Sequence, residues 1–290
     1  MLCYGARPDL GLQELFLLRV AKRWIAGVDL DSAIKDATSA NGKGIGAIVN
    51  FLGEEIEDPS MADAQVEEYL RLQKAIKDNT VEGFASVKLT QLGLGADDGG
   101  AVRRLERIAD NAENLGQRLF LDMEGSEFTE KTIAVYLDQL SRHRRTGLAL
   151  QAYTRRSESD MKKLLDRGAH IRLVKGAYRE SRDFVYPTRK EVAKNFSTLM
   201  GLLFERGDDF AIATHDSALV DEARRLAESK HANFRFEMLK GVRNELKAEL
   251  TRSGYKVYEY LPYGDRWFAY SKRRMTEHPS NVWLLLRSLV

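Results

Sequence analysis

The sequence predicts an α/β protein, a (β/α)8 TIM barrel with N-terminal helices. From about residue 45 onward, short β-rich runs alternate with amphipathic segments. Most of these runs are continuously apolar, which is typical of parallel strands that helices cover on both faces. The chain has 290 residues, and a barrel of this kind typically needs roughly 250. An open, doubly wound sheet is the main rival, but it would usually need fewer strands or a second domain.

The N-terminal part of the chain is expected to package the barrel. Residues 9–26 are rich in leucine, and we expect them to form a helix. We therefore assign residues 1–44 to an N-terminal helical segment that packs on the barrel, and residues 45–290 to the catalytic barrel. The sequence contains no linker or low-complexity stretch that would mark a second domain.

Eight short runs predict the strands, because each is apolar and ends at a polar or turn-forming stretch. They cover residues 45–51, 84–89, 118–123, 147–153, 170–174, 210–214, 234–238 and 255–260.

Between the strands, apolar residues recur at helical spacing. In residues 129–143, for example, Ile133, Tyr136, Leu137 and Leu140 form one stripe. A helix that begins at Ser157 is expected to stop at Gly168. The other predicted helices cover residues 60–77, 101–115, 188–206, 217–229, 241–252 and 265–277.

Composition excludes several classes of function. The net charge is only +2, from 45 basic and 43 acidic residues, which argues against a nucleic-acid partner. The single cysteine, Cys3, excludes a disulfide framework, and the scattered histidines make a metal site improbable. No apolar stretch is long enough to span a bilayer. We therefore expect a cytoplasmic protein without a metal.

Barrel enzymes carry their chemistry at the C-terminal ends of the strands, where the βα loops converge. This rule selects four charged residues that lie in or beside apolar strands: Lys88, Asp122, Arg172 and Lys175. One such residue alone is more often half of a structural ion pair, but together they indicate a site at one mouth. The same rule places Gln151, Thr214, His215, Glu237 and Tyr260 at strand ends. For His215, a structural role is favoured over that of a base.

Two other motifs could bind an anionic ligand. Arg273 and Arg274 lie on the helix predicted after the last strand. Two adjacent guanidinium groups near a barrel mouth suit a carboxylate, which each can bind in a bidentate way. A solvated helix face remains the alternative. Residues 93–100 resemble a dinucleotide fingerprint, but the spacing of the glycines fails, and we predict a loop there.

The strand-end motifs, taken together and in order, resemble those of proline dehydrogenases. The most specific are Arg172-Leu173-Val174-Lys175-Gly176-Ala177-Tyr178 and the arginine pair that follows Tyr260-Leu261-Pro262-Tyr263-Gly264. The resemblance runs from about residue 45 to the C-terminus. Asp216 departs from the pattern, because an asparagine is common at that position.

The resemblance implies roles for individual residues. Arg273 and Arg274 would clamp the substrate carboxylate, while Lys88, Asp122, Tyr178 and Tyr260 would shape the substrate pocket. Arg172 would lie beside the flavin N5, so it and Asp122 are the expected catalytic residues. The residues expected to hold FAD are Met123, Gln151, Lys175, Gly176, Ala177, Thr214 and His215, and Glu277 would support the arginine clamp.

The implied reaction is the FAD-dependent oxidation of L-proline to Δ1-pyrroline-5-carboxylate, with electrons passed to a quinone. Transient contact with a pyrroline-5-carboxylate dehydrogenase and with the inner membrane surface would follow from the same resemblance. One alternative is a lyase or aldolase in which Lys88 or Lys175 forms a Schiff base, and another is a non-catalytic binding barrel. A related enzyme for hydroxyproline is a third, with Tyr260 as the discriminating residue.

Overall fold

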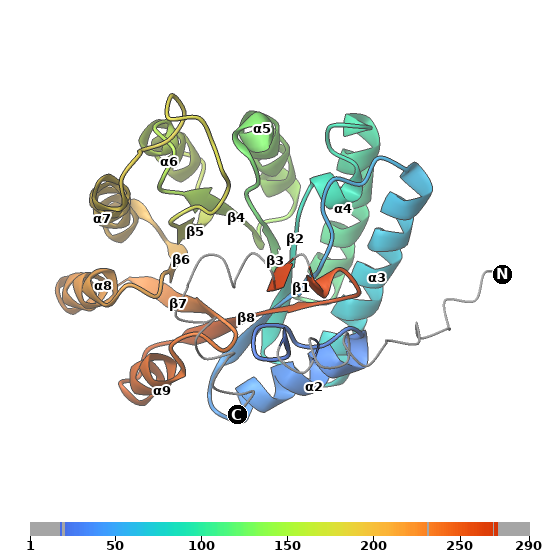
Figure 1. The fold of residues 1–290 in the computed structure, drawn as a ribbon, viewed down its shortest axis with the longest axis horizontal. Coiled ribbons are helices and arrows are strands. Elements are labelled where there is room, and N and C mark those ends of the chain that lie inside the picture. The colour runs from blue at the N-terminus through green and yellow to red at the C-terminus, as the bar shows by residue number, and fades with distance from the viewer. Residues whose placement is uncertain (1–17, 19–20, 231, 269, 272–290) are drawn as a thin grey trace.

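The computed structural model describes residues 18, 21–230, 232–268, 270 and 271. Its parallel strands close into a barrel in the order β1 to β8 (Figure 1). Closure is direct, because Ile48 of β1 pairs with Tyr260 of β8. The predicted (β/α)8 barrel is therefore confirmed, and the open sheet is excluded. The strands are β1 (Gly46–Phe51), β2 (Gly83–Val87), β3 (Leu119–Leu121), β4 (Thr146–Gln151), β5 (His170–Val174), β6 (Asp209–Ala213), β7 (Asn233–Leu239) and β8 (Val257–Tyr263).

Helices surround the barrel (Figure 1). Many begin where a polar side chain accepts a hydrogen bond from the first turn, as Asp97 does for α4 and Thr188, in a capping box, for α7. No described helix is long and apolar enough to cross a membrane. The helices are α2 (Leu30–Asn41), α3 (Pro59–Asp78), α4 (Asp98–Asn114), α5 (Ser126–Arg142), α6 (Ser157–Leu165), α7 (Arg189–Arg206), α8 (Ser217–Ser229) and α9 (Asn244–Arg252), with a short 3-10 turn, η1, at Thr90–Leu92.

The described part of the N-terminal segment lies against the last and first strands. Helix α2 fills the ring between α9 and α3 (Figure 1), and its Ala33 and Ala37 are fully buried in the main core. The backbone N–H of Ala26 donates to the carbonyl of Pro262 at 2.7 Å. Most of the helix expected over residues 9–26 lies outside the described residues.

Several predicted boundaries were wrong, among them the ends of the strands predicted over residues 118–123 and 147–153, which stop at Leu121 and Gln151. Strands β7 and β8 continue to Leu239 and Tyr263, so Glu237 and Tyr260 point from within the barrel wall rather than from its rim. Helix α9 begins at Asn244 instead of residue 241, because Gly241 and Arg243 have positive φ angles of 69° and 51°. The loop predicted over residues 93–100 ends early, since α4 begins at Asp98.

The barrel interior combines aromatic rings with buried charges. Ile48, Phe84 and Phe120 form an apolar layer, and next to it the interior holds charged side chains instead of the usual branched aliphatic ones. Small residues on neighbouring strands leave space for the aromatic rings and the charged side chains. A Cβ added to Gly147 would lie 2.2 Å from the Phe120 ring, and alanines flank Arg172 on both neighbouring strands, at Ala149 and Ala211.

Candidate active site

Asp122 is the centre of a polar cluster at the C-terminal mouth of the barrel. Its Oδ1 accepts hydrogen bonds from Arg172 Nη1 at 2.6 Å and from Ser86 Oγ at 2.8 Å. Its Oδ2 accepts one from the Tyr260 hydroxyl at 2.6 Å. Removal from water, together with the nearby Asp122 charge, raises the pKa of Tyr260 well above its ordinary value. The phenol therefore remains protonated and works as a donor.

Arg172 is 3% exposed and lies between two carboxylates. Its Nη1 contacts Asp122, and its Nε donates to Glu237. Burial alone would lower the pKa of Arg172, but the charges of Glu237 and Asp122 more than offset it and raise that pKa above its ordinary value. The Nη2 atom is buried and has no partner among the described residues. The Arg172 guanidinium is therefore a permanent cation beneath the mouth, and the N–H groups of its Nη2 atom are unused among the described residues.

Glu237, at 3% exposure, links Arg172 to a second buried arginine. Its Oε1 accepts from Arg235 Nε at 2.8 Å. Arg235 in turn donates through Nη1 to Asp209 at 3.1 Å. Sequence reasoning placed Glu237 near the mouth but gave it no role, and it missed Arg235. The pattern of strand β7 held a signal, since Arg235 and Glu237 alternate with apolar residues and so share one face.

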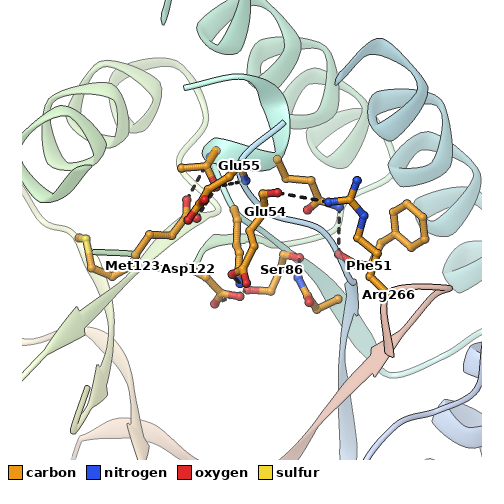
Figure 2. A network of polar contacts seen from close by, with 12 residues as sticks. Phe51, Glu54, Glu55, Ser86, Asp122, Met123 and Arg266 are labelled. Atoms are coloured by element: carbon orange, nitrogen blue, oxygen red, sulfur yellow. Dashed lines mark hydrogen bonds and ion pairs between the residues drawn. The ribbon is translucent and has the colours of Figure 1, made fainter. Parts of the chain in front are cut away.

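Lys88 follows β2 and forms an ion pair with Glu54 of the β1–α3 loop. Figure 2 draws Glu54 in one network of polar contacts with Ser86, Asp122 and Arg266. The Arg266 Nη1 donates to the backbone carbonyl of Glu54 at 3.4 Å. Glu54 was missed because its loop carries no periodic pattern. It gives Lys88 an anionic neighbour in the structure.

Gln151 ends β4 beneath the Met123–Glu124 backbone. Its Nε2 donates to the carbonyls of both residues at 3.0 Å, and its Oε1 is buried without a partner among the described residues. Glu124 accepts from the Thr90 backbone N–H at 3.0 Å and from the Thr90 hydroxyl. Burial raises the pKa of Glu124, although the Thr90 hydrogen bonds oppose that shift. Gln151 thus presents a fixed acceptor.

The β5–α7 loop carries the motif from Lys175 to Tyr178. Lys175 pairs with Asp216 at 2.7 Å. Gly176 has a φ of +106°, and a Cβ there would lie 2.2 Å from the Tyr153 ring. Ala177 is exposed and Tyr178 is half-buried. Further along the loop, Glu180 accepts from the Ser126 backbone N–H at 2.7 Å, which attaches the loop to the start of α5.

Thr214 and His215 follow β6. The buried Thr214 hydroxyl accepts from the backbone N–H of Asp216 at 3.2 Å. His215 Nε2 accepts from the backbone N–H of Leu239 at 2.9 Å, which requires a neutral imidazole protonated at Nδ1. This contact ties the end of β6 to the end of β7. It supports the structural role that sequence reasoning favoured for the histidine.

The structure therefore brings together Asp122, Arg172 and Tyr260, and it attaches Lys175 to the β6 exit. Arg273, Arg274 and Glu277 lie outside the described residues, so their predicted roles remain predictions. Within the described ranges, no group of histidine, cysteine and carboxylate side chains could hold a metal ion.

A pocket opens at the opposite, N-terminal end of the barrel. Arg118, Asp209 and Arg235 line it together with aromatic rings. Barrel enzymes react at the other end, so we do not assign the catalytic site to this pocket.

The cofactor that the sequence implies fits the residues at the C-terminal mouth. The flavin ring system presents both acceptors and an N–H donor along its edge. Gln151 Oε1 and Arg172 Nη2 are a buried acceptor and a buried donor without partners among the described residues. Gly176 lets the backbone of the β5–α7 loop lie close to the Tyr153 ring, where any side chain would clash with that ring. One acceptor and one cationic donor suit the edge of a flavin better than they suit a metal ion.

Comparison with known proteins places the chain in a family. A family model described as proline dehydrogenase matches residues 33–283. Proline dehydrogenase 1 of Bacillus subtilis (strain 168) is 32% identical over 273 residues, which is 93% of this chain and 90% of the relative. Proline dehydrogenase of Deinococcus radiodurans is 30% identical over 299 residues, covering 100% of this chain and 96% of the relative.

Among solved structures, proline utilization A from Bdellovibrio bacteriovorus, inactivated by N-propargylglycine, superposes with a TM-score of 0.83 at 23% identity. The match covers 89% of this chain but only 32% of the larger protein, so this chain corresponds to about a third of that neighbour. The likeness confirms the barrel fold. With a family model matched over most of its length, the chain belongs to the proline dehydrogenase family, and the predicted oxidoreductase class is confirmed.

Proposed function

We propose that the chain oxidises L-proline to Δ1-pyrroline-5-carboxylate with FAD bound at the C-terminal mouth of the barrel. The observation that carries the proposal is the pair of buried, unpartnered atoms there, Gln151 Oε1 and Arg172 Nη2. Buried polar atoms are costly unless they are satisfied, so a ligand edge that bonds both would remove that cost. Membership in the proline dehydrogenase family supports FAD as that ligand.

When bound, FAD would accept the hydride equivalent from the proline ring carbon next to nitrogen. Met123, Gln151, Lys175, Gly176, Ala177, Thr214 and His215 would hold it, with Glu277 supporting the arginine clamp. The chain itself must then fix the substrate so that the reacting carbon faces the cofactor, which is a positioning task.

Asp122 is suited to holding its neighbours rather than to removing a proton. Its oxygens accept from Arg172, Ser86 and Tyr260, so the carboxylate is already well supplied with donors. We propose that it fixes the Arg172 guanidinium and turns the Tyr260 ring toward the substrate. Arg172 would then supply fixed positive charge where negative charge develops.

The remaining substrate contacts follow the family pattern. Arg273 and Arg274 would bind the proline carboxylate, and Lys88 and Tyr178 would line the pocket. Lys88 contacts Glu54 in the present structure, so we expect substrate binding to rearrange this pair. Tyr260 would crowd a hydroxylated ring, which favours proline over hydroxyproline.

A Schiff-base lyase receives no support from the two candidate lysines. Such a lysine needs burial or another cation nearby to favour the neutral amine. Lys88 instead contacts Glu54, and Lys175 contacts Asp216. Electron transfer to a quinone at a membrane surface, and transient contact with a pyrroline-5-carboxylate dehydrogenase, are further parts of the proposal.

The test is a titration of the flavin-free protein with FAD, followed by flavin fluorescence. Gln151→Leu is expected to weaken FAD binding about tenfold or more, because a buried hydrogen bond is worth roughly 0.5–1.5 kcal/mol and its loss leaves a polar edge unpaired. Gln139→Leu is the matched control, since Gln139 of α5 is also buried with an unpartnered Oε1. Equal affinities for both variants would contradict the proposed FAD site.

A further inference from the structure

A line of alternating charges runs along the inside of the barrel. We call it the charge ladder, and it consists of Asp122, Arg172, Glu237, Arg235 and Asp209. Each member forms an ion pair with the next. The distances are 2.6 Å for Asp122–Arg172, 2.8 Å for Glu237–Arg235 and 3.1 Å for Arg235–Asp209, and Arg172 also contacts Glu237 directly. The ladder thus connects the reaction mouth to the opposite end of the barrel, where Arg118 contacts Asp209.

The middle of the ladder is buried, and its side chains are held by several contacts. Arg172, Arg235 and Glu237 are 3%, 5% and 3% exposed. Both guanidinium groups lie over the Phe120 ring, at 4.7 and 5.1 Å from its centroid. Both oxygens of Glu237 are engaged, one by each arginine. Charges in such surroundings are weakly screened, so a change at one member is felt by the next.

A purely structural role does not account for this arrangement well. A buried ion-pair network is often no more stable than apolar residues of similar volume, and barrel interiors are ordinarily filled by branched aliphatic side chains. Here strands β4 and β6 instead carry the small residues Ala149 and Ala211 beside Arg172. The strands beside Arg172 thus leave space for a buried guanidinium group where branched aliphatic side chains would ordinarily pack.

We propose that Glu237 and Arg235 are positioning residues that set how much of the Arg172 charge is felt at the mouth, and thereby the reduction potential of bound FAD. This inference rests on the proposed function. Two-electron reduction of FAD with uptake of one proton adds one negative charge to the flavin. Positive charge nearby favours the reduced form, and negative charge favours the oxidised form.

The charge order of the ladder predicts shifts of opposite sign. Glu237→Gln keeps the shape but removes the anion that balances Arg172, so the potential becomes more positive. Arg235→Met removes the cation that balances Glu237, so the potential becomes more negative. Arg235→Lys keeps the charge and is expected to stay near the unmodified protein. Loosened packing alone has no reason to give opposite signs.

The experiment is a spectroscopic redox titration of the full chain with bound FAD and a reference dye, without substrate. We expect each charge-removing variant to change the ratio of affinities for reduced and oxidised FAD about tenfold, which is about 30 mV for a two-electron couple. The matched control is Glu259→Gln, because Glu259 pairs with the buried Lys247 of α9, outside the ladder. Its potential is expected to equal that of the unmodified protein.

The outcomes separate this inference from the proposed function. If the unmodified chain takes up FAD but Glu237→Gln leaves the potential unchanged, the inference is overturned and the function stands. Shifts of the same sign in Glu237→Gln and Arg235→Met would also overturn it. If Arg235→Met does not fold, the difference in reduction potential between Glu237→Gln and Glu259→Gln decides the question. An unmodified chain that takes up no FAD overturns both.

Discussion

At the scale of the residue, Tyr260 shows how one hydroxyl can order a site. Its proton serves Asp122 at 2.6 Å, and the same carboxylate holds Arg172. The other tyrosine of β8 that faces the interior, Tyr258, donates to Glu82 at 3.1 Å at the opposite end of the barrel. The two tyrosines therefore form a matched pair with different partners.

Tyr260→Phe is expected to lower the free energy of unfolding by about 1–3 kcal/mol, because a hydrogen bond to a charged, mostly buried acceptor is lost. Urea unfolding measures this change. Tyr258→Phe is the control and is expected to cost less than about 1 kcal/mol, since Glu82 is exposed and can bond water instead. A Tyr260→Phe variant as stable as Tyr258→Phe would contradict the role given to this contact.

Gly176→Ala is expected to cost stability and FAD affinity together. The residue has a φ of +106°, and its Cβ would meet the Tyr153 ring. Gly168→Ala separates the two causes, because Gly168 has a φ of +68° and nothing within 4 Å of an added Cβ. Backbone strain alone, of order 1–3 kcal/mol, would then appear in both variants, and a fall in FAD affinity only in Gly176→Ala. Flavin fluorescence titration checks the difference.

The residues that sequence reasoning found and missed differ in a physical way. Asp122 and Arg172 interrupt apolar strands near their C-terminal ends, so the cost of burying a charge pointed to them. Glu54 lies in a loop with no periodic pattern, and its contact with Lys88 depends on the path of that loop. Arg235 sits deep inside the barrel, where the rule of strand ends gives no reason to look.

At the scale of the element, the strands and helices were predictable because their apolar patterns are strong, but their ends were less so. Strand β8 was expected to stop at Tyr260, before Pro262. It continues because a proline lacks only its own N–H, and the Pro262 carbonyl still accepts from Ala26. Strand β7 likewise runs past Glu237 to Leu239, whose N–H donates to His215. These partners are distant in sequence and no local pattern reveals them.

Asp216 connects the start of helix α8 to Lys175, a residue of the proposed FAD site. The Asp216 side chain caps the helix by accepting from the Ala218 N–H at 3.1 Å, and it also pairs with Lys175. The Lys175 hydrogen bond is the main cause that lowers the pKa of Asp216. An asparagine would keep the cap but not the charge, and an alanine would keep neither.

Asp216→Asn is therefore expected to change the free energy of unfolding by less than about 1 kcal/mol, since the ion pair is partly exposed. Asp216→Ala is expected to cost about 0.5–2 kcal/mol through the lost cap. Both variants release Lys175 and should change FAD affinity in the same direction. Thermal unfolding and FAD titration measure the two effects, and an Asp216→Asn loss equal to that of Asp216→Ala would rule out the capping role.

At the scale of the whole molecule, buried tyrosines predict an alkaline limit to stability. Removal from water raises the pKa of Tyr69, Tyr260 and Tyr263 well above the ordinary value of 10.0. As pH rises past about 10, the unfolded chain loses these protons first and binds fewer than the folded one. The free energy of unfolding must then fall with rising pH, while below pH 10 this contribution is fully present.

Urea unfolding at a series of alkaline pH values checks this expectation. Tyr69→Phe should reduce the slope of the unfolding free energy against pH, because one tyrosine no longer contributes a proton. The replacement is informative because Tyr69 is fully buried, with two acceptors, the Ser86 carbonyl and Gln91 Oε1, each 3.0 Å from its hydroxyl. A stability that stays level between pH 10 and 11 would show that these phenols ionise as freely in the folded protein as in the unfolded one.

The most direct test of the central claim is the visible spectrum of the purified chain, recorded before and after L-proline is added without oxygen. We predict a flavin spectrum that bleaches when L-proline is added. In the Arg273→Met and Arg274→Met variants, we predict that the flavin does not bleach. A flavin that ignores L-proline would contradict the assigned substrate and direct attention to hydroxyproline and other cyclic imino acids. A colourless chain that takes up no added FAD would contradict the proposed function.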